Sequence, residues 1–178
     1  MTTELLILMV LFEEKSTIYG LKQKIEKLFS LFLKISFGTI HPALKKLEEN
    51  KYVLLKAKTS SGGQKSSLYS ITEEGKEYFT DLMIENLPDN PTIANQLVNI
   101  KLMGLSRVDP ESQKLTLDSI LRYLENQKIK AKNLRADFED IENKIQQKVI
   151  NYNIQRILED IQYIQKISED ICWINSLI

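Results

Sequence analysis

The segment from Ile35 to Asn50 combines an apolar stripe with cationic and polar side chains. Its apolar residues Ile40, Leu44 and Leu47 follow the i, i+4, i+7 spacing that places side chains on one face of a helix. The polar and cationic residues left largely off that stripe are Thr39, His41, Lys45 and Lys46. A short helix of this kind, preceded by another amphipathic helix, is what a helix-turn-helix protein presents to the major groove of DNA. The segment therefore predicts a DNA-contacting helix.

The sequence contains few residue patterns that could support catalysis or metal binding. The chain has one histidine, His41, and one cysteine, Cys172, far apart in the sequence, which offers no metal-ligand cluster. It contains no glycine-rich phosphate loop and no Ser/His/Asp or Cys/His set in a recognisable context. The paired glutamates at 13–14, 48–49 and 73–74 fall at helix ends or exposed faces, where acids serve capping and solubility. We expect no enzyme, no cofactor and no metal site.

Charge is balanced over the whole chain but not along it. The 178 residues include 24 basic and 24 acidic side chains. Between Lys34 and Lys76, eight lysines stand against four glutamates, whereas twelve basic and thirteen acidic residues follow from Leu87 onward. A basic excess around one candidate helix is the electrostatic footprint of nucleic-acid binding, here a modest one.

The N-terminal part of the chain is expected to form three helices. Residues 3–13 are apolar nearly all round, which is typical of a central helix covered on several sides. Residues 18–32 form an amphipathic pattern behind a Ser-Thr pair that can cap a helix, and Gly20 within it implies a close packing contact. The third helix is the cationic segment, with regular helix expected from about Thr39 so that Pro42 lies in its first turn.

A β-hairpin and a further helix follow. Residues 52–58 and 66–71 are rich in strand formers and flank a Ser/Gly turn, with Lys65 near its tip. Thr72, followed by two glutamates, predicts the start of another helix. Three helices, a hairpin and a helix predict a winged helix-turn-helix DNA-binding domain over residues 1–86.

A change in composition marks a second domain. Residues 87–91 contain two prolines and no periodicity, which predicts a linker. Residues 92–178 are expected to be helical: a short helix over 93–103, a long helix from Asp109-Pro110 to about Val149, a turn near 151–153 and a last helix. The fold class is therefore mainly α with a small β-hairpin.

The long helices predict a dimerisation arm. Their apolar residues alternate mostly by four and three positions, which is typical of a coiled coil. The residues expected at the dimer contact are Leu121, Leu124, Phe138, Ile161, Ile164, Ile171 and Trp173. Trp173 is also the candidate for an apolar effector pocket at a subunit interface.

Nothing in the sequence indicates export or a membrane partner. The apolar run from Leu5 to Phe12 spans eight residues, whereas a membrane-spanning helix needs about 20. Cys172 cannot form a disulfide within the chain, which suits a reducing compartment. We expect a cytoplasmic protein.

Three segments of the N-terminal domain resemble the PadR family of bacterial transcriptional regulators. They are Ile18–Ile25, Ile35–Glu48 and Leu68–Gly75, in the order and spacing of the family. The helical tail looks like that of the longer subfamily with AphA-type virulence activators, in which the tail is an antiparallel arm that makes the dimer. The resemblance implies a regulator, usually a repressor, that binds a palindromic DNA operator as a homodimer. It also implies sensing of varied signals, so a small apolar or aromatic effector is an expected ligand.

The resemblance extends to individual positions of the recognition helix. Residues 36–43 fall on the family's motif, with His41 where tyrosine is usual. The hairpin tip has one cation, whereas many relatives have several, which weakens the expected groove contact there. The expected DNA contacts are Ser36, Thr39, His41, Lys45, Lys46 and Lys65.

Two other classes of function stay open at this point. The zero net charge and the poor wing favour a protein-interaction module, a winged-helix scaffold that binds another protein without reading DNA. The lysines of the recognition helix and the three-part motif favour the DNA regulator. Small-molecule sensing as the primary trait is the third possibility, with Trp173 as its candidate residue.

Overall fold

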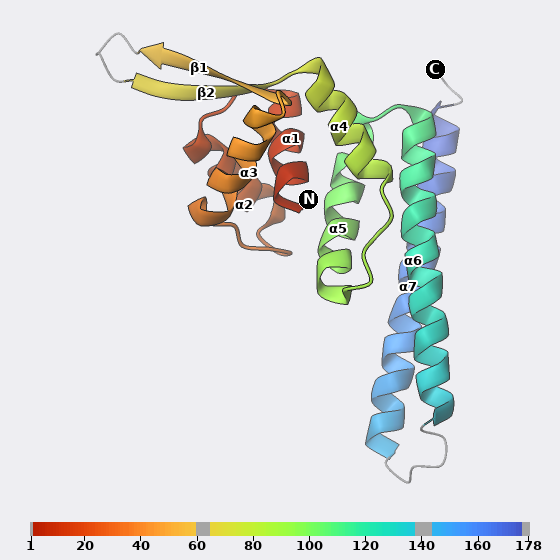
Figure 1. Cartoon of the computed structure of the whole chain (residues 1–178). Helices are drawn as coiled ribbons and strands as arrows, with labels where there is room; N and C mark the ends of the chain where they lie inside the picture. The colour runs from red at the N-terminus through yellow and green to blue at the C-terminus, as the bar shows by residue number, and fades with distance from the viewer. Residues whose placement is uncertain (1, 60–64, 138–143, 176–178) are drawn as a thin grey trace. The chain divides into compact units, whose positions relative to one another are not determined.

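The computed structural model describes residues 2–59, 65–137 and 144–175, and its chain forms two compact units, Met1–Ser112 and Gln113–Ile178 (Figure 1). The chain is mostly helical, with a two-stranded antiparallel hairpin after three N-terminal helices and long helices at its C-terminal end. This architecture confirms the predicted fold class. None of the described helices is both long and apolar enough to cross a membrane.

Helix α1 (Thr2–Glu13) is the centre of the first unit. Every side chain from Leu5 to Leu11 is buried, as predicted for a helix that is apolar nearly all round. The elements that pack against it are α2 (Ile18–Phe29), α3 (Phe37–Glu49), α4 (Glu73–Ile84), α5 (Pro91–Gly104) and β2 (Lys65–Ile71). Because α1 contacts all of them, it fixes their positions relative to one another.

Helix α2 begins as predicted and ends three residues early. The Thr17 hydroxyl accepts a hydrogen bond from the amide of Gly20 at 3.1 Å. A Cβ on Gly20 would lie 2.5 Å from Ser16 Oγ, which is the close contact that this glycine implied. Phe29 is the last fully buried residue of α2. Its carbonyl accepts hydrogen bonds from the amides of residues 32 and 33, and this turn ends the helix. Phe32, which the prediction placed inside this amphipathic helix, therefore lies beyond the end of α2 and is 44% exposed.

The hairpin pairs β1 (Val53–Thr59) with β2 in antiparallel register, Val53 opposite Ile71. These bounds agree with the predicted strands to within one residue. Ser16, just before α2, forms a bridge to Tyr69 of β2, with N–H to carbonyl distances of 3.0 and 2.8 Å. The hairpin is thus attached by main-chain bonds to the start of α2.

Helix α4 is capped by Thr72, whose hydroxyl accepts from the amide of Gly75 at 2.9 Å, as predicted. A Cβ on Gly75 would lie 2.0 Å from the carbonyl oxygen of Tyr52. Since no side chain fits there, glycine at 75 allows α4 to approach the start of β1. The buried side chains of α4, Phe79, Leu82 and Met83, then reach the core.

Helix α5 buries a cation and exposes two apolar side chains. Ile93 and Met103 are 41% and 44% exposed, whereas Lys101 is 1% exposed. The Lys101 ammonium donates to the backbone carbonyl of Glu85 at the end of α4, which gives the buried cation a partner. Helix α5 packs against α1, so the expected linker at 87–91 lies inside the first compact unit. A functional boundary at 87–91 stays a prediction.

The second unit consists of most of α6 (Pro110–Asp137) and all of α7 (Lys144–Asn175), which run in opposite directions (Figure 1). Asp109 caps α6 as predicted, since its carboxylate accepts from the amides of Glu111 and Ser112, each at 3.0 Å. The expected turn at 151–153 is wrong, because α7 passes through these residues without a break. Buried Ile154 continues the apolar stripe of α7 past them, and tertiary burial overrides the weak helix propensity of asparagine.

Candidate nucleic-acid interface

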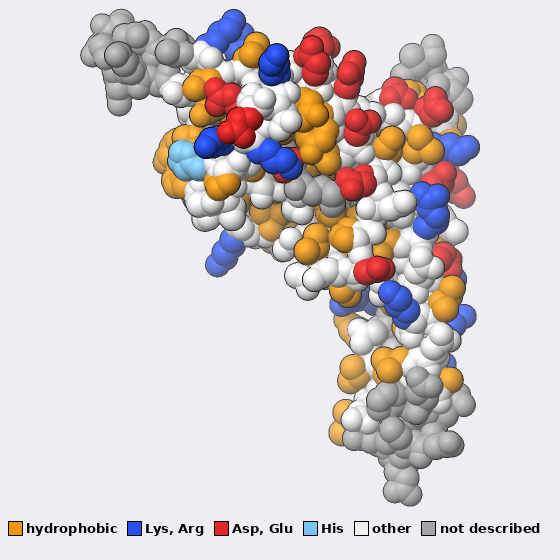
Figure 2. Space-filling view, in the orientation of Figure 1, with side chains coloured by type: hydrophobic (Ala, Val, Ile, Leu, Met, Phe, Trp, Pro, Cys, Tyr) orange, Lys and Arg blue, Asp and Glu red, His pale blue; other side chains and the backbone are white. Residues whose placement is uncertain are grey.

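Helices α2 and α3 form the helix-turn-helix, and α3 exposes one polar face. Ile40, Leu44 and Leu47 are at most 2% exposed, as their spacing predicted. The opposite face carries the predicted DNA contacts of this helix and its cap, all exposed: Ser36, Thr39, His41, Lys45 and Lys46. In the region of α3 and α4, Figure 2 shows acidic and basic side chains interspersed with apolar ones. The structure therefore leaves all five of these predicted residues exposed.

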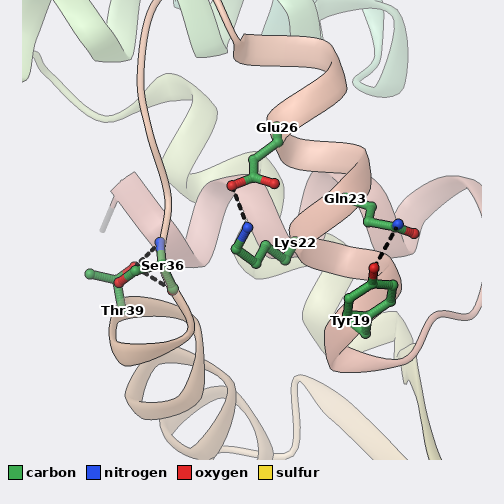
Figure 3. A network of polar contacts seen from close by, with 6 residues as sticks. All are labelled: Tyr19, Lys22, Gln23, Glu26, Ser36 and Thr39. Atoms are coloured by element: carbon green, nitrogen blue, oxygen red, sulfur yellow. Dashed lines mark hydrogen bonds and ion pairs between the residues drawn. The ribbon is translucent and has the colours of Figure 1, made fainter.

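The start of α3 is built from Ser36 and Thr39 (Figure 3). The Thr39 hydroxyl accepts from the amide of Ser36 at 3.2 Å and donates to its carbonyl at 2.8 Å. The helix begins at Phe37, so the expectation that Pro42 lies in the first turn is wrong. Pro42 lacks the N–H that would bond the carbonyl of Gly38. Gly38 is exposed, so water can take the place of that bond.

The two lysines of the recognition helix each have an acidic partner within the chain. Lys45 is 77% exposed and lies 3.7 Å from Glu49, one turn along the same helix. Lys46 lies 2.9 Å from a carboxylate oxygen of Glu4 in α1, whose side chain is only 7% exposed. Lys45 is therefore the more available of the two for a phosphate, because its pair with Glu49 is long and exposed.

Glu4 connects three helices of the first unit. One carboxylate oxygen accepts from Lys46 of α3, and the other accepts from the Tyr78 hydroxyl of α4 at 2.7 Å. Tyr78 in turn stacks on Tyr52, with ring centroids 4.2 Å apart and planes at 13°. Burial raises the pKa of Glu4, and the hydrogen bonds from Lys46 and Tyr78 lower it. The lowering effects are together the larger, so the pKa of Glu4 lies below its usual value. This carboxylate is therefore ionised in the fold.

The same contacts shift the pKa values of its partners upward. The hydrogen bond to Glu4 and the charge of Glu4 raise the pKa of Lys46. Burial and the same carboxylate raise the pKa of Tyr78. Sequence reasoning missed this group. The available signal was Glu4 itself, because it is a charged residue inside an otherwise apolar helix.

An exposed aromatic cluster lies beside the N-terminal end of α3. Phe37 is 38% exposed, and its ring centroid is 6.4 Å from those of both Tyr19 and His41. Lys22 lies 5.5 Å from the centroid of Phe37 and also pairs with Glu26 (Figure 3). Of this cluster the sequence analysis singled out His41 alone. Phe37 precedes Ile40 by three residues and Leu44 by seven, which is the spacing of the buried stripe, so its position in the sequence did not mark it as an exposed residue.

The hairpin contributes less to this surface than the helices do. Lys65 is the first residue of β2, but its side chain lies outside the described residues, so its predicted DNA contact stays a prediction. Lys56 on β1 is exposed. Leu54 and Leu55 of the same strand are 49% and 40% exposed, which makes the described part of the wing apolar as well as basic.

The predicted dimer residues divide by burial. Leu124, Ile161 and Ile164 are 2% to 6% exposed within one chain, and their places in a dimer contact stay predictions. Leu121 and Ile171 are half-buried, Trp173 is 65% exposed, and Phe138 lies outside the described residues.

The effector pocket predicted at Trp173 can be compared with the surface of the second unit. A surface hollow along α6 is lined by Asp118, Leu121, Arg122, Glu125 and Asn126, and Trp173 is not among its lining residues. Among residues that the structure describes, none of the His, Cys, Asp and Glu side chains form a group of three or more that could hold a metal ion. An effector at Trp173 stays a prediction.

Comparison with known proteins places the helix-turn-helix in a family. Residues 7–81 match the sequence profile of the transcriptional regulator PadR-like family. The first unit thus carries a PadR-like domain. The match spans the recognition helix, both strands of the hairpin and most of α4, and it agrees with the three motifs that resembled this family. A search of curated proteins found no significant match.

Solved structures of PadR-like proteins are similar to this chain at low identity. Bacillus subtilis PadR in complex with operator DNA is 16% identical over 94% of this chain and 98% of that chain, with a TM-score of 0.46. The same protein in complex with p-coumaric acid is 15% identical over 96% of this chain and 99% of that chain, with a TM-score of 0.43. A transcriptional regulator from Clostridium thermocellum is 26% identical over 44% of this chain and 75% of that chain, with a TM-score of 0.41.

Proposed function

We propose that this protein is a sequence-specific DNA-binding regulator that acts as a homodimer on a palindromic operator, most simply as a repressor. The observation that carries the proposal is the exposed polar face of α3, held in place by three buried residues inside a PadR-like domain. Such a helix enters the major groove, and two copies must lie about 34 Å apart, or a multiple of it, to read one face of the duplex.

The contacts around α3 suggest how the surface would meet DNA. Lys45 can exchange its exposed partner Glu49 for a phosphate with little cost, since exposed pairs contribute little. The apolar edge of Phe37 suits the methyl group of thymine. A small apolar or aromatic effector would act by shifting the population toward a different spacing of the two recognition helices.

The test compares single substitutions at one ion pair. Binding of the full chain to the DNA upstream of its own gene is followed by fluorescence anisotropy over a series of salt concentrations. Lys45→Ala is expected to weaken binding and to reduce the slope of log K against log salt by about two per dimer. Glu49→Ala, the matched control, leaves Lys45 without its acidic partner and is expected to strengthen binding.

The double variant Lys45→Ala with Lys46→Ala should bind more weakly than either single variant. Thermal unfolding is measured in parallel, because Lys46 also bonds to Glu4 and its loss affects stability. Unchanged operator binding by the folded double variant contradicts a recognition role for α3.

A protein-interaction module is the second candidate function. Three lysines near α3, at 22, 45 and 46, pair with glutamates, and apolar Tyr19, Phe37 and Leu31 are 60%, 38% and 88% exposed. A surface of paired charges and exposed apolar groups suits a protein partner. Absence of a specific complex with upstream DNA at 50 mM salt, where phosphate contacts are strongest, would favour this candidate.

A further inference from the structure

Lys46 of α3 is held in place by a carboxylate that is itself fixed. The Lys46 ammonium donates to one oxygen of Glu4 at 2.9 Å, and the Glu4 side chain is only 7% exposed. The other oxygen of Glu4 accepts from the Tyr78 hydroxyl at 2.7 Å, and the Tyr78 ring stacks on Tyr52. Because Glu4 is buried and both of its oxygens accept hydrogen bonds, it cannot follow Lys46 toward a ligand.

The neighbouring cation, Lys45, is paired in a different way. Its ammonium lies 3.7 Å from Glu49, and the two side chains are 77% and 64% exposed. Either side chain can turn away into solvent at little cost, since exposed pairs contribute little. A lysine on its flexible four-carbon stem can then reach any phosphate nearby. Lys45 is therefore a mobile cation of α3, whereas Lys46 is a fixed one.

Lys46 is nevertheless open to a ligand. Its side chain is 58% exposed. An ammonium has three N–H donors, and the bond to Glu4 uses one of them. A phosphate can therefore accept from another donor while the bond to Glu4 stays in place. Leaving Glu4 altogether would strand a buried carboxylate without its cation, which is strongly unfavourable. Lys46 thus binds a phosphate at the place where Glu4 holds it, or not at all.

We propose that Glu4 is a positioning residue that makes Lys46 a contact for operator DNA and not for DNA of other sequences. On the operator, base contacts from α3 fix one register, and the held ammonium meets a phosphate there. In other registers Lys46 stays neutralised by Glu4. Cations supply nearly all of non-specific affinity, so Glu4 lowers that affinity and raises the ratio of specific to non-specific binding. The inference rests on the proposed function, because it requires that α3 reads an operator.

The variant Glu4→Gln tests the inference in the full chain. It keeps the size of the side chain and an oxygen that accepts from Tyr78, but it removes the charge that holds Lys46. Fluorescence anisotropy over a series of salt concentrations compares the DNA upstream of the gene with a duplex of the same composition in shuffled order. On the shuffled duplex, the released Lys46 is expected to steepen the slope of log K against log salt by about two per dimer and to raise affinity roughly tenfold. Operator affinity is expected to change by less than about threefold, because Lys46 already contacts a phosphate there.

Three controls separate positioning from stability and from net charge. Tyr78→Phe removes the other bond of Glu4 without releasing Lys46, so it is expected to lower thermal stability and to leave both salt slopes unchanged. Glu49→Gln removes the same charge from the exposed pair with Lys45 and is expected to strengthen binding to both DNAs equally, so that their ratio stays the same. In a Lys46→Ala background, Glu4→Gln is expected to change neither slope, because no ammonium is left to release.

Lys46→Gln, which leaves Glu4 in place, provides a second measurement should Glu4→Gln fail to fold. It is expected to reduce the salt slope on the operator by about two per dimer and to leave the slope on the shuffled duplex unchanged.

Two results overturn the inference: an unchanged slope on the shuffled duplex for folded Glu4→Gln, or an equal loss of slope on both DNAs for Lys46→Gln. A wild-type chain that prefers its operator but gives either result keeps the proposed function and loses the role of Glu4. A wild-type chain without preference for its upstream DNA loses the proposed function and the operator contact of Lys46. A steeper shuffled-duplex slope for Glu4→Gln would still show, in that chain, that Glu4 neutralises Lys46.

Discussion

The first unit buries two charged side chains, one on α1 and one on α5, and their surroundings shift their charge equilibria in opposite senses. Glu4 of α1 is 5% exposed and receives hydrogen bonds from Lys46 and Tyr78. Lys101 of α5 is 1% exposed and donates to a backbone carbonyl of Glu85. The pKa of Glu4 is lowered, so its charged form is favoured, whereas burial lowers the pKa of Lys101 to about 8 against the opposing charge of Glu85. The fold therefore favours the charged form of Glu4, beside the recognition helix, and disfavours the charged form of Lys101 in α5.

The largest effect is expected from Glu4→Ala. This change removes two charge-assisted hydrogen bonds and leaves a small cavity, so the free energy of unfolding at pH 7 should fall by about 2–3 kcal/mol. Because the folded pKa of Glu4 is lowered, its contribution is present above the unfolded value of about 4.5 and is lost as the pH falls below it. Urea unfolding at pH 7 and pH 3 measures this, with exposed Glu77→Ala as the control.

If Glu4→Ala lowers the free energy of unfolding as much at pH 3 as at pH 7, the whole effect comes from packing. The ionised carboxylate would then contribute nothing to the contrast with Lys101.

A smaller effect is expected from Tyr78→Phe. The variant keeps the stacked ring on Tyr52 and removes only the hydroxyl that donates to Glu4. A hydrogen bond to a charged acceptor contributes about 1.5 kcal/mol or more, so the free energy of unfolding should fall by about that amount. The pKa of Glu4, followed by carbon NMR of its carboxyl group, should rise. An unshifted carboxyl pKa would show that Tyr78 does not stabilise the charge.

The smallest effect, and one of opposite sign, is expected from Lys101→Met. Replacing a buried cation by an apolar side chain of similar length should raise the free energy of unfolding by about 1 kcal/mol near pH 6. The gain should shrink as the pH rises from about 8 toward 10.5, because the folded wild-type chain loses the Lys101 proton there before the unfolded chain does. Exposed Lys114→Met is the control. A destabilised variant at pH 6 would mean that the bond to the Glu85 carbonyl outweighs desolvation.

The sequence could predict elements wherever one local rule decided them. Thr17, Thr72 and Asp109 are caps because a side-chain oxygen next to a helix start accepts from the free amides two or three residues on. Ile40, Leu44 and Leu47 are buried because their spacing puts them on one face of α3. These features depend on neighbours within a few residues, which a single sequence displays.

The sequence could not predict what depends on distant partners. Helix α2 ends at Phe29 because that is its last buried side chain, although its apolar pattern continues to Phe32. Lys101 can be buried because the backbone carbonyl of Glu85, just after α4, accepts a hydrogen bond from its ammonium. Lys46 looked like a solvent-facing phosphate contact, but Glu4, 42 positions earlier in the chain, holds its ammonium. In the candidate site, the sequence could predict which residues lie on the exposed face of α3. It could not predict which of the lysines there already pair with an acidic residue.

The bridge between Ser16 and Tyr69 has a consequence for the order of folding. It joins residues more than fifty positions apart, and long-range pairings of this kind form late because loop closure opposes them. The helix-turn-helix can assemble from contacts that are closer in sequence, so β2 acquires its second main-chain partner, after β1, only when α2 has a fixed start. The attachment of the hairpin to the start of α2 therefore forms after both of these elements, and it is lost when the start of α2 unravels.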